Sequence, residues 1–280
     1  MPAKVKLLPI IPHEMVLVVF ALAVVILGDS LIYIVLPASF REFGISDTFG
    51  ISAAFWIGFA LSINRFIRIA SNSLAAQVYQ RYGFRTPFIG ATLLGVATTL
   101  SYGFTRGILL LLLARALWGV AYSHLRLGVY ITAFEVGGSA HRGRLLGFYN
   151  AGQRAGSFIA VTAGAVLADF ATRGTTFTLV AAVGLLGVLV ALRVPRVNIS
   201  LSESNRNSHS VVTTNSRGRF WRLAISAGAE ATRVTRRRML AISILRFSTA
   251  FAANGLAIAT ISPFLTELFE QDKTLFGFSV

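Results

Sequence analysis

A single aspartate inside a membrane-length apolar run constrains this chain most. Residues 15–40 read MVLVVFALAVVILGDSLIYIVLPASF, and Asp29 is the only charge in them. A run of this length can cross a bilayer, which needs about 20 apolar residues. A carboxylate at such depth costs at least about 2.5 kcal/mol to insert and is rare without a polar partner or a watered cavity. The sequence predicts a polar pathway through a membrane, with Asp29 as a functional acid or as a structural carboxylate locked to an arginine.

The composition excludes an ordinary soluble domain. Of the 280 residues 55% are hydrophobic and 13% are charged, with a mean hydropathy of +0.69, far from soluble averages. The net charge of +15 does not indicate nucleic acid, because the cations stand mainly in short connections between apolar runs. No cysteine is available for a disulfide framework or a cysteine metal site. We therefore expect a polytopic protein whose first partner is the lipid bilayer.

The apolar runs predict an all-α membrane helix bundle in three parts. Residues 1–194 form a six-helix bundle, 195–239 a linker, and 240–280 the first helix of a second bundle. Within the linker, 220–238 fit either a basic interfacial helix or a solvated segment. The expected spans are 15–40, 51–78, 87–104, 108–129, 145–167, 176–192 and 240–265.

The distribution of Lys and Arg predicts the orientation. The N-terminus and the connections 79–86, 132–144 and 193–238 carry 16 of these residues, and the opposite connections carry 4. The side richer in Lys and Arg is normally cytoplasmic. We expect a multi-pass protein of the cell membrane with a cytoplasmic N-terminus.

An internal repeat suggests that the chain stops early. GDSLIYIVLPASFREF (28–43) aligns with ANGLAIATISPFLTEL (253–268), so that Asp29 falls on Asn254. Internal repeats are common in transporters. The repeat predicts a second copy of the six spans, beginning at about residue 240 and cut off, whose missing part is an expected partner.

The connection after the second run resembles the signature loop of the major facilitator superfamily. In SNSLAAQVYQRYGFRTPF the fitting residues are Ala76, Arg81, Gly83 and Arg85. Gln80 stands where that family has an aspartate, and Phe84 replaces a usual arginine. Arg115, four residues before Gly119, resembles a second family motif. The resemblance implies a secondary transporter working by alternating access, and a cavity-facing Arg115 that influences proton transfer.

Depth estimates pair Asp29 with Arg115. At 1.5 Å per residue, Asp29 lies about 16 Å and Arg115 about 10 Å from the outer ends of their runs. Such a pair would lower the insertion cost of both residues. We interpret the Asp29–Arg115 pair as a switch that responds to a proton or to the substrate. The alternative is a salt bridge that only stabilises the structure.

Other polar residues are candidates for lining a cavity. An excess of arginine there favours an anionic solute, and the alternative is that these arginines meet interfacial water, lipid phosphates or helix ends. Any of the aromatic residues can instead belong to the packing. The candidates are Asn64, Arg65, Arg68, Gln153, Arg154, Tyr33, Trp118 and Tyr122.

Small residues repeat every four positions in the fifth run, at Gly152, Gly156, Ala160 and Gly164. Such a stripe lets helices approach closely, and we read it as packing.

The sequence predicts a proton-coupled transporter of a small solute, and not an enzyme. No metal-ligand spacing, nucleophile motif or phosphate-binding loop is present, and no cofactor is expected. The alternatives are a complete seven-helix receptor or sensor, and an inactive transporter remnant.

Overall fold

The computed structural model describes residues 11–46 and 50–195, which belong to one compact unit. The predicted linker helix, the seventh span and the repeat of the first span lie outside these residues.

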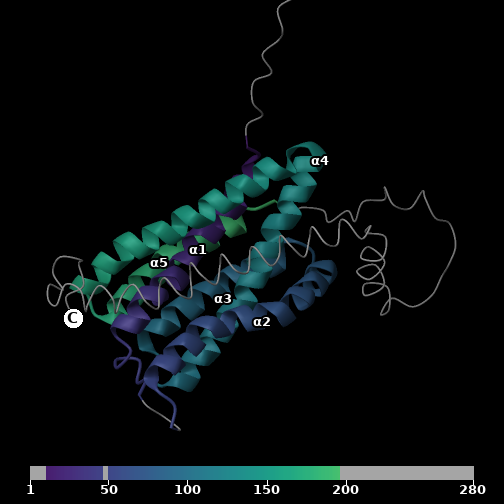
Figure 1. Ribbon diagram of the computed structural model, residues 1–280. Helices are drawn as coiled ribbons and strands as arrows, with labels where there is room; N and C mark the ends of the chain where they lie inside the picture. Colours follow the sequence, from purple (N-terminus) through teal and green to yellow (C-terminus); the bar gives the residue numbers. More distant parts are fainter. Residues whose placement is uncertain (1–10, 47–49, 196–280) are drawn as a thin grey trace, which may run out of the picture. The chain divides into compact units, whose positions relative to one another are not determined.

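The described part of the chain forms five α-helices (Figure 1). Four of the six predicted spans correspond to separate helices, and the other two belong to the long α4. The helices are α1 (His13–Ala38), α2 (Ala53–Tyr82), α3 (Arg85–Phe104), α4 (Ile108–Phe170) and α5 (Arg173–Leu192).

The helix ends follow local sequence signals. Ser52 immediately precedes α2 and caps it, because its side chain accepts a hydrogen bond from the backbone N–H of Phe55. Thr172 caps α5 in the same way by accepting from Thr175. Such caps satisfy N–H groups that have no partner within the helix. Between α2 and α3 only Gly83 and Phe84 are left outside the helices, and Gly83 has a φ of +73°, where glycine is favoured.

The 63-residue helix α4 doubles back on itself, which differs from the expected irregular connection at 132–144. Its two arms meet side by side, because the Tyr130 and Tyr149 rings lie 5.8 Å apart. In a straight helix, 19 residues would separate them by about 28 Å. Figure 1 shows the bend beside the α4 label. We call Ile108–Gly137 the first arm and residues 145–170 the second arm.

Helix α1 lies at the centre of the packing. It contacts α4 and α5 extensively, whereas α2 packs almost entirely on α4. The predicted small-residue stripe of the second arm faces α1. A side chain added at Gly152 would meet Val19, one at Gly156 the backbone of Ala23, and one at Gly164 Leu31.

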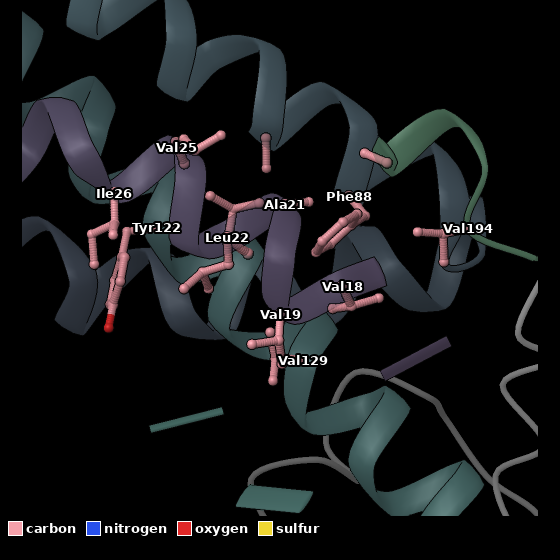
Figure 2. Packing of buried hydrophobic residues seen from close by; sticks show 14 of the residues in the cluster. Val18, Val19, Ala21, Leu22, Val25, Ile26, Phe88, Tyr122, Val129 and Val194 are labelled. Carbon is pink, nitrogen blue, oxygen red and sulfur yellow. The ribbon is translucent and has the colours of Figure 1, made fainter. Parts of the chain in front are cut away.

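The largest apolar core joins α1, α3, α4 and α5. Figure 2 shows Val18, Leu22 and Phe88 in this cluster, with Tyr122 beside Ile26. Trp118 also belongs to it and is 1% exposed, so the structure places this residue in the core. A side chain added at Gly95 would collide with Val25 and press on Trp118.

Five described segments are long and apolar enough to cross a membrane. They are α1, α2, α3, the first arm of α4 and α5. The second arm is not among them, although it packs between its neighbours as a predicted span should.

Candidate functional site

Asp29 and Arg115 form an ion pair between α1 and the first arm of α4. The guanidinium Nη1 of Arg115 donates to Oδ1 of Asp29. The Arg115 side chain is fully buried, whereas the Asp29 side chain is 14% exposed. The structure thus joins the two residues that the depth estimate paired, with the acid as the accessible partner.

Helices α2 and α1 supply further hydrogen-bond partners of Arg115. Its Nε donates to the backbone oxygen of Ala60 at 3.1 Å, and Nη2 donates to that of Leu61 at 3.3 Å. Nη2 also donates to the Tyr33 hydroxyl at 3.2 Å, and the Tyr33 hydroxyl in turn donates to Leu61. A carbonyl oxygen has two lone pairs, so these helical carbonyls can accept an additional hydrogen bond. Arg115 therefore ties α1, α2 and α4 together.

A second arginine, Arg68, lies about two helical turns beyond Ala60 and Leu61 on α2. The Nε of Arg68 donates to the backbone oxygen of Asn64 at 3.2 Å, which draws the side chain back toward the level of the ion pair. Its guanidinium carbon lies 4.7 Å from the ring centre of Tyr122. An arginine over an aromatic face gains a cation–π attraction. The half-buried Arg68 is thus positioned by a backbone carbonyl and an aromatic ring, and not by an acid.

Hydrogen bonds extend from Tyr122 into the second arm of α4. The amide nitrogen of Gln153 donates to the Tyr122 hydroxyl at 2.9 Å, and the hydroxyls of Tyr122 and Tyr149 lie 3.4 Å apart. Polar groups from three helical segments therefore meet around the Tyr122 side chain.

The remaining cavity candidates differ in exposure. Arg65 and Arg154 are exposed, whereas Asn64 is 1% exposed. The side-chain oxygen of Asn64 is buried without a hydrogen-bond partner among the described residues. Buried polar atoms normally have a partner, so this oxygen is an acceptor still open to one.

The signature-loop residues lie at the junction of α2 and α3. Ala76 is half-buried on α2, and Gln80, Arg81 and Gly83 are exposed. Arg85 donates to the backbone oxygen of Leu192 at 2.5 Å, where α5 ends. A basic side chain there satisfies a carbonyl that has no partner within the helix.

Phe84 replaces the arginine usual at its position and is buried. It stacks on Phe88, with the ring centres 5.5 Å apart. The substitution therefore adds an aromatic contact to the core in place of a charge.

Sequence reasoning missed several polar contacts between helices. The Ser71 and Ser123 hydroxyls lie 2.6 Å apart, and Ser30 donates to Ser157 at 2.9 Å. Tyr79 donates to the backbone oxygen of His124 at 2.9 Å. The available signal was the presence of hydroxyl groups inside apolar runs, but it does not specify which ones meet. Among the described residues, no group of His, Cys, Asp and Glu could hold a metal ion.

Comparison with known proteins places the chain in a family. No curated protein matches the sequence. The model of the Major Facilitator Superfamily matches residues 18–280, which is most of the chain and includes every helix described above except the first residues of α1. The resemblance to this family is thereby confirmed. The all-helical membrane bundle and the family match agree that this chain belongs to the Major Facilitator Superfamily of membrane transporters.

Proposed function

We propose that the chain is part of a proton-coupled secondary transporter that moves a small solute by alternating access. Asp29 is the acid that takes up and releases the proton, and Arg115 is its counter-ion. The observation that carries this proposal is the ion pair between them, deep inside α1 and α4. Asp29 lies about 24 Å from the first residue of α1 and about 14 Å from its last. An ionisable residue at such depth is expected to be functional.

The contacts of Arg115 suggest what a proton would change. A protonated Asp29 has no negative charge to attract Arg115. The arginine would keep its hydrogen bonds to Ala60 and Leu61 of α2. Its remaining contact with α1 would be the Tyr33 hydroxyl. Protonation therefore loosens α1 from α2 and from the first arm of α4, while the first arm and α2 stay joined, which is a two-state change of the kind that alternating access needs.

The orientation of the chain in the membrane follows from its Lys and Arg residues. The N-terminus and the connection 79–86 face the cytoplasm of a cell membrane, because Lys and Arg accumulate on that side. A second helix bundle, which the internal repeat predicts, provides the opposite wall of the solute pathway.

Infrared spectroscopy of the purified protein tests the proton site without knowledge of the solute. We expect a protonated-carboxyl band that appears on acidification and is lost in Asp29→Asn. Asp169→Asn is the matched control, because Asp169 is an exposed acid near the end of α4. A band that is unchanged in Asp29→Asn would show that this carboxylate takes up no proton.

Transport by the complete natural protein in proteoliposomes tests the coupling, using a solute found by screening for thermal stabilisation. Asn resembles the protonated acid in shape but cannot release a proton. We expect Asp29→Asn to lose uptake driven by a proton gradient and to retain solute exchange. Full gradient-driven uptake by this variant would rule out the coupling role.

A further inference from the structure

We infer that Arg68 binds the anionic group of the transported solute, a carboxylate or a phosphate, in the middle of the membrane. This inference rests on the proposed transport function and adds the chemical class of the solute and a residue that recognises it.

The position of the Arg68 side chain leaves the two terminal nitrogens of its guanidinium without a partner among the described residues. Nε is occupied by the backbone oxygen of Asn64, and the flat face lies over Tyr122. The two terminal nitrogens have no hydrogen-bond partner among the described residues. Arginine binds carboxylates and phosphates through parallel N–H groups of its planar fork. A guanidinium fixed at one nitrogen and at one face is preorganised to offer the other two nitrogens.

The balance of charge at this depth favours an anion. Arg115 is neutralised by Asp29. Asp29 lies near enough to act on the charge of Arg68, but its carboxylate is already held by Arg115. Arg65, one turn away on α2, adds further positive charge. An uncompensated cation in the middle of a membrane is costly, and a bound anion would reduce that cost.

The depth of Arg68 indicates a soluble anion as the occupant, not a lipid headgroup. Helix α2 runs from Ala53 to Tyr82, and Arg68 lies in its middle. Each end is therefore more than about 20 Å away along the helix. Lipid phosphates lie at the surfaces of a hydrocarbon core about 30 Å thick, so a headgroup would have to leave its layer to reach the guanidinium.

The groups beside Arg68 can contact the rest of a solute. The Tyr122 ring offers an apolar face, and its hydroxyl and Gln153 offer polar atoms. The open side-chain oxygen of Asn64 belongs to the residue whose backbone holds Arg68. An organic anion with a hydrogen-bond donor would satisfy more of these groups than inorganic phosphate.

Arg126 provides a matched control on the same protein. Its guanidinium also lies over a tyrosine, with the carbon 5.2 Å from the Tyr130 ring centre. Its Nε donates to the hydroxyl of that same tyrosine at 2.9 Å. Arg126 is exposed and lies three turns along α4 from Arg115, so it shares the chemistry of Arg68 but not its position beside the ion pair.

The test is anion binding to the full chain in phosphatidylcholine nanodiscs, followed by thermal unfolding. The probes are acetate, benzoate, succinate and inorganic phosphate, with choline as the cationic comparison. A ligand that binds the folded state raises the unfolding temperature. We expect saturable stabilisation by at least one anion and none by choline. Arg68→Gln should weaken the binding about tenfold to hundredfold, and Arg126→Gln should leave it unchanged.

Two further measurements distinguish anion binding at Arg68 from misfolding and from lipid binding. Arg68→Lys retains the charge without the planar fork, so it should fold if Arg68→Gln does not and should still bind more weakly than the unmodified chain. Nanodiscs containing phosphatidylglycerol test the lipid source. Stabilisation by this lipid alone, by none of the soluble anions, or by anions equally in the Arg68 variants would overturn the inference. The Asp29 infrared band is independent of all these results, so the proton role and the anion site can fail separately.

Discussion

The two arms of α4 hold their neighbours by different means. The second arm packs on α1 through Gly152, Gly156 and Gly164, where any added side chain would collide with α1. One hydrogen bond, from Ser30 to Ser157, crosses this otherwise apolar contact. Helices in a bilayer gain little from the hydrophobic effect, and small residues allow the close packing that replaces it.

The first arm packs on α2 through polar groups as well as apolar ones. The Ser71–Ser123 hydrogen bond, the Arg68–Tyr122 contact and the bonds of Arg115 to the α2 backbone all lie in this contact. In α2 only 11% of the most apolar window is buried, against 56% in α1. Helix α2 thus leaves most of its surface uncovered and is joined to the bundle by polar contacts beside a small apolar cluster around Ala60, whereas α1 is enclosed. Direction-dependent bonds thus contribute to the contact of the first arm with α2, and close packing of small residues dominates the contact of the second arm with α1.

The largest loss of stability is expected when Arg115, the fully buried partner of the ion pair, is replaced. Arg115→Gln leaves the Asp29 carboxylate without a cation, and should lower the free energy of unfolding by about 3 kcal/mol. Adding Asp29→Asn removes the unpaired charge and should recover most of the loss. A double-mutant cycle measured by unfolding in detergent checks this. Additive losses would mean that the two side chains do not stabilise one another.

A smaller effect is expected at the close-packed contact. Gly156→Leu places a side chain against the backbone of Ala23, which cannot turn aside as a side chain can. We expect a loss of about 2 kcal/mol, typical of overpacking, seen as a lower unfolding temperature. Gly147→Leu on the same arm is the control, because nothing lies within 4 Å of a side chain added there. Equal results for the two variants would contradict the packing role of the stripe.

The smallest effect is expected from one hydroxyl of the polar contact. Ser71→Ala removes the hydrogen bond to Ser123 and should cost about 0.6 kcal/mol, the average for such bonds in a membrane protein. Ser73→Ala is the comparison, because Ser73 is exposed and bonds only to the backbone oxygen of Ala70 in its own helix. Unfolding measured for both variants decides whether α2 relies on single hydrogen bonds or on the arginines.

The bend of α4 shows where sequence reasoning about the fold reached its limit. The residues of 132–144 were expected to leave the helix because they are polar and join two apolar runs. They contain no proline, so every backbone N–H remains able to continue the helical hydrogen bonds. The reversal is fixed by contacts between the arms, such as that of Tyr130 with Tyr149, which no local pattern reveals.

The sequence by itself determined the membrane setting, the helical runs and the need of Asp29 for a polar partner, because burying charge and backbone in lipid is costly wherever the chain folds. It also indicated the family through the signature loop and the surroundings of Arg115. Only the tertiary structure decided which polar groups meet. It placed Trp118 in the core, Arg115 on Asp29 and Arg68 over Tyr122, because such contacts depend on how helices distant in sequence are rotated against one another.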